Sequence, residues 1–304
     1  MTSTPLFSPA RKPAEAPARR TAGACPAHLP PQAVGCLEAL LSAPGQAVVA
    51  VDFDGTLAPV VPDPAAARPL PRALTALTAL ARYGVRVAIV TGRPAGYVVT
   101  AAGLRAGAAE PPVTVLGHYG LQRWDSVTDE LRSPAPHPAM TRVRTGLHRL
   151  VTEHGIPARI EDKTHSLCLH TRSCPDPAGA LRTLEPPVRA LADGLGLRLE
   201  AGRHALEVRA DGVDKAMALA AFLAERPVRP VLYAGDDLAD LPVARLLADR
   251  RAQGDPALMV YSAPASADEV VPALEDGSDL RVSGPAGVAD LLTAVARALR
   301  EGRP

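Results

Sequence analysis

The feature that most constrains the fold is the alternation of short apolar runs with helical segments. The runs are rich in Val and bounded by turn residues, which is typical of buried strands. They read AVVAV (47–51), VRVAIV (85–90), VTVLG (113–117), PVLYAG (230–235) and ALMVYS (257–262). Helical patterns cover about 33–42, 70–83, 213–225 and 286–300, with two more within 91–99 and from about 240. Because strand–helix–strand connections pair strands in parallel, the sequence predicts an α/β fold with a doubly wound parallel sheet.

The middle of the chain departs from this alternation. Helical patterns near 139–153 and 177–192 are each followed by two short strand patterns with tight connections. Such connections are typical of antiparallel strands, so the sequence predicts an inserted α+β (αββαββ) domain at 134–208. The parallel-sheet core then covers 33–133 and 209–304. Residues 1–32 are rich in Pro, Ala and Arg, which predicts a disordered tail.

Composition argues against several classes of function. The formal net charge is +1, and aromatic residues make up only 3% of the chain. Nucleic-acid binding is therefore not expected, since it needs a basic stripe or an aromatic platform. No apolar run reaches the ~18 residues of a membrane span, so no membrane association is expected either. The four cysteines form no CxxC pair and are interpreted as reduced thiols of a cytoplasmic protein.

Carboxylates follow two of the predicted strands. Asp52 and Asp54 end the first strand, in the segment VDFDGTLAP, and Asp236, Asp237 and Asp240 follow the strand PVLYAG. In open parallel sheets, ligands bind beyond the carboxyl ends of the strands, so these side chains are expected to meet. Because clustered carboxylates repel one another, we expect a divalent cation between them, and an oxygen ligand set suits Mg²⁺.

Two further side chains suit a phosphoryl group at the same edge. Thr91 follows the second strand in the segment TGR, and Lys215 opens the helix after the inserted block. A hydroxyl, an ammonium and a cation together neutralise the charge on phosphoryl oxygens. Asp52 and Asp54 are two residues apart and project to the same side of an extended segment. This spacing lets Asp52 attack phosphorus to form an aspartyl-phosphate, while Asp54 protonates the leaving alcohol and later activates water.

The ordered set DFDGTLAP, TGR, a downstream Lys and GDD with a further Asp resembles the haloacid dehalogenase superfamily of phosphohydrolases. The resemblance implies a Rossmann-like core with an inserted cap domain. It also implies Asp52 as nucleophile and Asp54 as acid and base, with Thr91 and Lys215 on the phosphoryl group. The implied Mg²⁺ ligands are Asp52, the main chain of Asp54, and Asp236, with Asp237 and Asp240 as outer or additional ligands.

The inserted block carries a second resemblance. The segments EDKTHSLCLHTR (161–172) and ALEVRADGVDK (205–215) are similar to the trehalose-6-phosphate phosphatases, and GHYG (117–120) fits the same family. Glu161, Lys163 and Glu207 would then hold the glucose unit distal to the phosphate. The remaining implied cap and cleft residues are Arg93, His118, Ser166, His170 and Arg172. Taken without the family, the same side chains are typical of a polar outer sheet face with cross-strand ion pairs.

The sequence departs from the family pattern at a few positions. Ala216 stands where the family commonly has Gly, Leu241 stands where many members have an acidic residue, and ADG (210–212) replaces a Pro-containing turn. The expected activity is Mg²⁺-dependent hydrolysis of trehalose 6-phosphate, functionally coupled to a trehalose-6-phosphate synthase. The alternatives are a phosphatase for sucrose phosphate or mannosylglycerate phosphate, a phosphomutase that keeps its aspartyl-phosphate, and a non-catalytic sugar-phosphate sensor.

Overall fold

The computed structural model describes residues 29–107, 110–202 and 204–302. Most of the predicted disordered tail, including Cys25, lies outside these residues. The first helix, α1, begins at Pro31 and ends at Ser42, so it starts inside the predicted tail. Proline is well suited to the first turn of a helix, because the amide proton that it lacks has no partner there.

A large sheet of eight strands forms the core of the described chain, in the order β12-β11-β10-β1-β2-β3-β4-β5. Its strands are β1 (Val48–Val51), β2 (Arg86–Val90), β3 (Val113–Gly117), β4 (Gln122–Asp125), β5 (Glu130–Arg132), β10 (Val231–Gly235), β11 (Ala257–Ala263) and β12 (Leu280–Ser283). The six strands from β12 to β3 pair in parallel, and β4 and β5 add an antiparallel edge. The central strand β1 is buried along its whole length.

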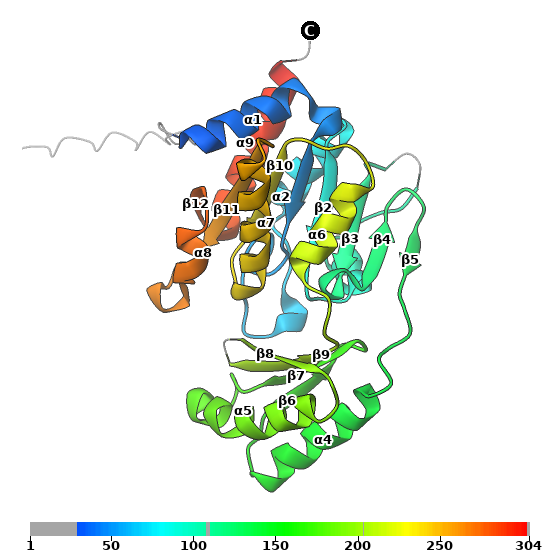
Figure 1. Ribbon diagram of the computed structural model, residues 1–304, viewed down its shortest axis with the longest axis vertical. Helices are drawn as coiled ribbons and strands as arrows, with labels where there is room; N and C mark the ends of the chain where they lie inside the picture. Colours follow the sequence, from blue (N-terminus) through cyan, green and yellow to red (C-terminus); the bar gives the residue numbers. More distant parts are fainter. Residues whose placement is uncertain (1–28, 108–109, 203, 303–304) are drawn as a thin grey trace, which may run out of the picture.

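Helices cover both faces of this sheet, as the doubly wound prediction requires (Figure 1). One apolar cluster joins α1, α2, α3 and α9 to side chains such as Val49 and Val51 of β1. The other joins α6, α7 and α8 to Val48 and Ala50, which point to the opposite face. The helices are α2 (Pro71–Arg82), α3 (Ala95–Ala101), α6 (Lys215–Ala224), α7 (Leu241–Ala252), α8 (Pro272–Asp276) and α9 (Gly284–Glu301).

Four short elements, β4, β5, β12 and α8, were not predicted from the sequence. Their patterns are weak for physical reasons. The strand β5 is exposed at every residue, and β4 buries only alternate side chains, among them Trp124. A short edge strand therefore has no continuous apolar run to mark it. The consequence is that the sheet is mixed at one edge and not parallel throughout.

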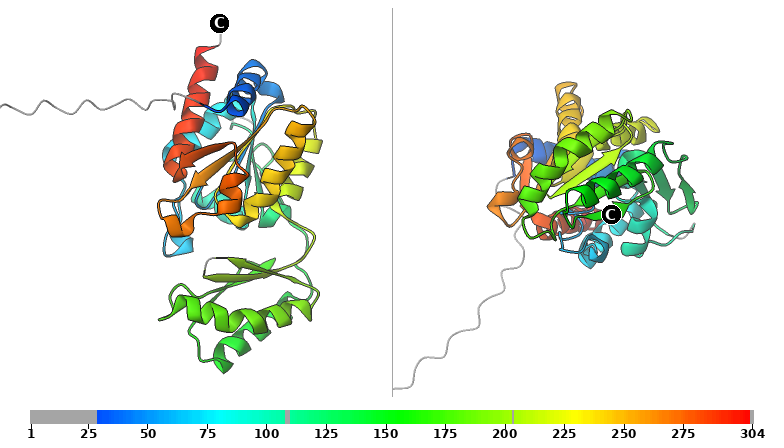
Figure 2. Two further views of the ribbon diagram at one scale, coloured as in Figure 1. Left: turned by 60° about the vertical axis from the view of Figure 1, so that its left-hand side comes forward. Right: turned by 90° about the horizontal axis from the view of Figure 1, so that it is seen from below.

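A second, four-stranded antiparallel sheet is built by the middle of the chain, in the order β6-β7-β9-β8. Its elements are α4 (Met140–Glu153), β6 (Arg159–Asp162), β7 (Ser166–His170), α5 (Pro177–Asp193), β8 (Arg198–Gly202) and β9 (Ala205–Arg209). We call residues 140–209 the cap. The cap has its own apolar cluster, in which Leu147, Leu184 and Leu206 are fully buried between the helices and one sheet face. Figures 1 and 2 place the other face toward the carboxyl ends of the core strands.

The order of elements in the cap is the predicted αββαββ. The predicted domain limits at 133/134 and 208/209 stay a prediction, although β9 itself continues to Arg209. Within the described residues, no helix is both long and apolar enough to cross a membrane.

Candidate active site

The candidate site lies where β1, β2 and β10 end, which we call the carboxyl edge. Asp52 follows β1, Thr91 follows β2, and Asp236 and Asp237 follow β10. The strand order runs in opposite directions from the β1–β10 pair, which makes this pair the topological switch point of the sheet. The amide of Asp52 donates to the carbonyl of Ala234 at 2.9 Å, so the backbone itself joins the two strand ends.

Lys215, the first residue of α6, brings an ammonium into this group of acids. Its Nζ lies 3.1 Å from Oδ2 of Asp52, 2.9 Å from Oδ1 of Asp240 and 3.5 Å from Oδ1 of Asp237. Both Lys215 and Asp52 are buried. Burial alone would lower the pKa of Lys215, but the three carboxylates outweigh it and raise that pKa above its ordinary value. The side chain is therefore held as a cation against Asp52.

Asp240 is fully buried, and protein donors occupy both of its oxygens. Its Oδ1 accepts from Lys215 and from the hydroxyl of Tyr233 at 2.6 Å. Its Oδ2 accepts from the backbone amides of Asp236 and Asp237 at 3.0 and 3.1 Å. One oxygen each of Asp52, Asp237 and Asp240 lie within 4.8 Å of one another. Because each oxygen of Asp240 already accepts two hydrogen bonds, Asp240 is better suited to hold the loop after β10 than to bind an ion directly.

Asp236 lies apart from this trio and packs against the loop after β1. The hydroxyl of Thr56 lies 3.3 Å from its Oδ1, and Gly55 lies directly against its carboxylate. Ser262 of β11 donates to the carbonyl of Gly55 at 2.7 Å and so fixes the same turn. Thr56 lies within the DFDGTLAP motif but was given no role from the sequence, and Ser262 was not found because it has no pattern beyond that of an ordinary buried hydroxyl.

The donor set fits a divalent cation. Asp52, Asp236, Asp237 and Asp240 supply only oxygen ligands, and Lys215 is the one ammonium that pairs with them in the described part of the chain. Burial, reinforced by the neighbouring carboxylates, raises the pKa of both Asp52 and Asp236. The acids therefore carry more negative charge than the protein offsets, which is the environment that a hard cation such as Mg²⁺ stabilises.

Gly55→Ala tests the packing of Asp236. Gly55 has φ +66°, and a Cβ atom there would lie 2.0 Å from Oδ2 of Asp236. We expect the variant to displace Asp236 and weaken Mg²⁺ binding about tenfold, a usual cost of disturbing the support of a metal ligand. Gly212→Ala is the matched control, because Gly212 has φ +80° with nothing within 4 Å of the added atom. Titration calorimetry with Mg²⁺ measures both variants, and equal affinities would contradict a role for Asp236 at the metal.

Asp54 is paired with Arg93 across the mouth of the site. Nε of Arg93 lies 2.6 Å from Oδ2 and Nη2 lies 2.8 Å from Oδ1, which is a bidentate contact. The guanidinium also lies 4.4 Å from the ring centre of Tyr97. Among the described residues, Asp54 makes no ion pair with Lys215, which contacts Asp52, Asp237 and Asp240 instead. The partner of Asp54 is Arg93, which the sequence placed only near the cleft.

Three acidic side chains form a row across the cap sheet. Register pairs Glu161 with Cys168, Cys168 with Glu207, and Glu207 with Glu200, so all lie on the face opposite the apolar cluster. Each acid has a basic partner: His170 for Glu161 at 2.8 Å, Lys163 for Glu207 at 3.2 Å and Arg209 for Glu200 at 2.7 Å. The hydrogen bond from His170 lowers the pKa of Glu161 to about 2.

Glu207 is the centre of the contact between cap and core. Its carboxylate accepts from Ser166 at 2.5 Å, from Lys163 at 3.2 Å, and from the hydroxyl of Tyr119 in the core at 3.1 Å. Burial alone would raise the pKa of Glu207, but Lys163 and these hydrogen bonds hold it below its ordinary range. The carboxylate is therefore ionised and has about one free acceptor position, since a carboxylate offers roughly four.

The segment His118–Gly120 has an unusual backbone. His118, Tyr119 and Gly120 all have positive φ, at 48°, 59° and 98°. The resulting turn lays the ring of Tyr119 over Gly92 and under the guanidinium of Arg209, 4.4 Å from the ring centre. Tyr119 was missed as a site residue, although the GHYG segment itself was noticed. Strain of this kind in a non-glycine residue is held only by surrounding packing.

His118, the first residue of this turn, is buried and lines neither half of the cleft described below. Its ring packs edge-on against that of His165 in the cap, with the centres 5.0 Å apart. Burial lowers the pKa of His118 to about 4, so the ring is neutral near pH 7. Its implied role in substrate binding stays a prediction, and the structure gives it a packing role between core and cap.

A cleft separates the cap from the carboxyl edge, and its two halves have volumes of about 1000 and 610 Å³. Asp54, Tyr119, Arg172, Glu207 and Asp237 line both halves. The half nearer α3 adds Asp52, Thr91, Arg93, Glu161, Lys163, His170 and Lys215, and the other half adds Asp236. The structure thus brings to one cleft every predicted site residue except His118, Ser166 and the buried Asp240, and Ser166 instead supports Glu207 from within the cap.

Comparison with known proteins first defines the class. The chain is similar to the solved structure of a haloacid dehalogenase-like hydrolase from Bacteroides thetaiotaomicron, with a TM-score of 0.57, 15% identity, and coverage of 82% of this chain and 98% of that one. The C. albicans trehalose-6-phosphate phosphatase C-terminal domain gives a TM-score of 0.71 at 20% identity, covering 89% of this chain and 98% of that one. The α/β core with its separate antiparallel cap therefore has the haloacid dehalogenase fold.

The family follows from the sequence match. The model of the trehalose-phosphatase family matches residues 50–247, which is more than half of the chain, and the chain belongs to this family. A trehalose-phosphate phosphatase from Mycobacterium marinum is 31% identical over 198 residues, which cover 62% of this chain and 48% of that protein. The chain thus matches about half the length of that relative.

Proposed function

We propose that this chain hydrolyses trehalose 6-phosphate to trehalose and phosphate through an aspartyl-phosphate on Asp52. The observation that carries the proposal is the position of Asp52, buried at the switch point, 3.1 Å from Lys215, in the cleft beneath the polar face of the cap. Membership of the trehalose-phosphatase family supports the substrate, and the cap row of Glu161, Glu207 and Glu200 supports a ligand with many hydroxyl groups.

In the proposed first step, a carboxylate oxygen of Asp52 forms a bond to phosphorus, and the ester bond from phosphorus to the sugar oxygen breaks. Lys215 and Thr91 neutralise charge on the phosphoryl oxygens, and Asp54 gives its proton to the leaving sugar oxygen. In the second step, water attacks phosphorus while Asp54 takes a proton from it. Phosphate leaves and the Asp52 carboxylate is restored.

Arg93 has a defined part in this scheme. Its bidentate contact engages both oxygens of Asp54, so Asp54 can reach the leaving sugar oxygen only when the pair separates. An incoming phosphoryl group competes for the same guanidinium, because arginine binds carboxylates and phosphates through the same planar fork. Substrate binding would therefore release Asp54 for its role as an acid.

The metal proposed at the carboxyl edge is Mg²⁺, held by Asp52 and Asp236, with Asp237 as a further oxygen donor. When bound, it would supply positive charge to the transferring phosphoryl group. Asp240 would keep the loop after β10 in place through its two backbone hydrogen bonds. We further propose a cytoplasmic enzyme with its core at 33–133 and 209–304, its inserted domain at 134–208, and functional coupling to a trehalose-6-phosphate synthase.

Phosphate release from a set of esters tests the proposal. We expect trehalose 6-phosphate to be hydrolysed at least about tenfold faster than glucose 6-phosphate, sucrose 6-phosphate or mannosyl phosphoglycerate. A site built to bond hydroxyls discriminates strongly against ligands that lack them or place them where they leave its polar groups unpaired. EDTA is expected to abolish release and added Mg²⁺ to restore it. Faster hydrolysis of another ester would overturn the substrate, and release that is insensitive to EDTA would overturn the metal.

A further inference from the structure

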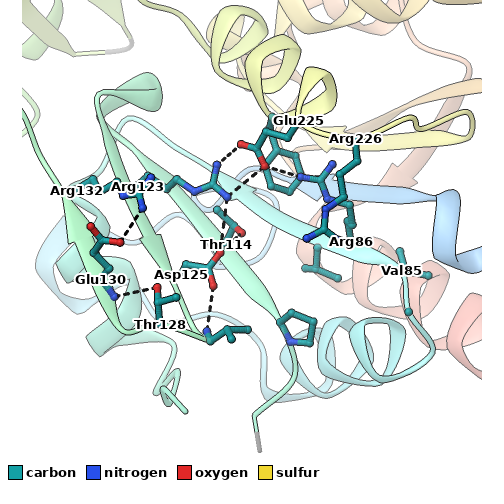
Figure 3. Close-up of a pocket in the computed structure, with 15 residues that line it drawn as sticks. Val85, Arg86, Thr114, Arg123, Asp125, Thr128, Glu130, Arg132, Glu225 and Arg226 are labelled. Carbon is teal, nitrogen blue, oxygen red and sulfur yellow. Dashed lines mark hydrogen bonds and ion pairs between the residues drawn. The ribbon is translucent and has the colours of Figure 1, made fainter. Parts of the chain in front are cut away.

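A second recess lies at the opposite end of the core sheet from the carboxyl edge. It has a volume of about 630 Å³ and is lined by the start of β2, the strands β3 to β5, and the C-terminal end of α6 (Figure 3). None of the predicted catalytic or metal-binding residues lines it. Arg86 begins β2, whose other end leads to Thr91, and Phe222 lies on the helix that begins with Lys215. The recess is therefore separate from the cleft, although the same elements build both.

Two guanidinium groups bind a single carboxylate in this recess, and a third lines the recess beside them. Oε2 of Glu225 lies 2.8 Å from Nη2 of Arg86 and 3.3 Å from Nη2 of Arg123, and Oε1 accepts from Nη1 of Arg123. Arg226 is the next residue, and within the described chain its side chain has no ion pair (Figure 3). Arg123 also reaches Asp125, at 3.7 Å. At the inner end of the recess, positive charge therefore exceeds negative charge.

One donor in this group is buried without any partner. Nη1 of Arg86 is inaccessible to solvent and makes no hydrogen bond, although the side chain as a whole lines the recess. A buried donor without a partner carries a desolvation cost that native proteins rarely leave uncompensated. The repulsion from Arg226 and Arg123 adds to this cost. A negatively charged ligand in the recess would reduce the repulsion among the three guanidinium groups, whereas Nη1 itself lies beyond its reach.

The floor of the recess is apolar and rigid. The ring of Phe222 is buried, and the guanidinium carbons of Arg86 and Arg123 lie 4.0 and 5.6 Å from its centre. Both distances are within the range of a cation–π contact, and the hydrogen bonds to Glu225 hold the two guanidinium groups in place before any ligand arrives. Val85 and Val87 continue the apolar lining. The recess thus combines fixed cationic donors with an apolar wall, as small-molecule sites commonly do.

We propose that this recess binds a phosphate-bearing small molecule. A phosphate group offers several charged oxygens, which can accept from Arg86, Arg123 and Arg226 together while Glu225 keeps its place. A carboxylate carries less charge and only two oxygens, so it meets this donor set less completely. The volume is within the range of small-ligand sites, and Asp125 and Glu130 at the outer rim oppose a long polyanion such as nucleic acid.

Titration calorimetry of the full chain with pyrophosphate, in EDTA, tests this site. We expect saturable binding in the wild type and a loss of affinity of roughly tenfold in Arg226→Gln, about the effect of one charge-assisted hydrogen bond. Because Arg226 is exposed and has no ion pair in the described chain, this variant is expected to fold normally. Glu225→Gln removes the competing charge while it keeps a polar side chain, so it is expected to bind pyrophosphate several-fold more tightly.

Arg229→Gln is the matched control. Arg229 is three residues from Arg226 and exposed, and it lies outside the recess. Its variant is expected to bind as the wild type does. Absence of saturable binding, or equal affinities in Arg226→Gln and Glu225→Gln, would overturn the site. Citrate binding as tightly as pyrophosphate would overturn the phosphate assignment. Failure of the proposed phosphatase activity would leave these results unchanged, because binding is measured without turnover.

Discussion

Asp52→Asn is expected to abolish phosphate release from trehalose 6-phosphate while the protein stays folded. The amide cannot supply the carboxylate oxygen that forms the bond to phosphorus, so the loss in kcat should be at least about a thousandfold, in line with the removal of other covalent nucleophiles. The variant is nearly isosteric. Because Asp52 is only 4% exposed, its charge is costly to bury, and its replacement removes that cost.

The direction of the change in stability of Asp52→Asn can also be predicted. Burial raises the pKa of Asp52 in the folded state above its ordinary value. In metal-free protein, this group therefore lowers stability as pH rises from the ordinary aspartate pKa up to the raised one. Asp52→Asn should lose that pH dependence and unfold at an equal or higher temperature than the wild type near pH 7.

The measurement pairs a phosphate-release assay with thermal unfolding in EDTA. Asp249→Asn is the control, since Asp249 is an exposed carboxylate on α7 far from the sheet edge, and its variant should match the wild type in both assays. Retention of a tenth or more of the wild-type rate by Asp52→Asn would remove Asp52 from the role of nucleophile.

The parts of the fold that the sequence predicted are those with strong periodic patterns. The segment AVVAV became β1 from Val48, and α2 runs from Pro71 to Arg82, close to the predicted 70–83. Both have continuous or periodic burial that is visible in the sequence. The strand β5, whose three residues are all exposed, depends instead on pairing with β4, and pairing between edge strands leaves little trace in composition.

The candidate site divides in a similar way. Asp52, Thr91 and Asp236 were expected together because the ends of parallel strands meet, which is a rule about the backbone. The contact between Arg93 and Asp54 depends on how far an arginine reaches, and the position of Tyr119 depends on three successive residues with positive φ. Neither can be read from spacing. From the sequence alone, His170 and Glu161 fitted either a sugar-binding site or an ordinary polar outer sheet face. The register between β6 and β7 and the cleft lining place this pair on the cleft side.

Glu207→Gln is expected to separate recognition of the sugar from the chemistry of phosphate transfer. The substitution keeps the size of the side chain but removes the charge that pairs with buried Lys163. It weakens three hydrogen bonds, two within the cap and one that joins the cap to Tyr119 of the core. Loss of charge-assisted bonds, worth about 1.5–3 kcal/mol each, predicts a fall of roughly tenfold to a hundredfold in kcat/KM for trehalose 6-phosphate.

Hydrolysis of p-nitrophenyl phosphate supplies the decisive comparison. This ester has no sugar hydroxyls for the cap, while Asp52, Thr91 and Lys215 treat its phosphoryl group as they treat that of the sugar phosphate. Its kcat/KM should therefore change little in Glu207→Gln, which would also establish that the core is folded. Glu153→Gln, at an exposed position on α4, is the control and should leave both substrates unaffected. An equal loss on both substrates would assign Glu207 to holding the cap and core together, because a residue that only positions the cap cannot distinguish one ester from the other.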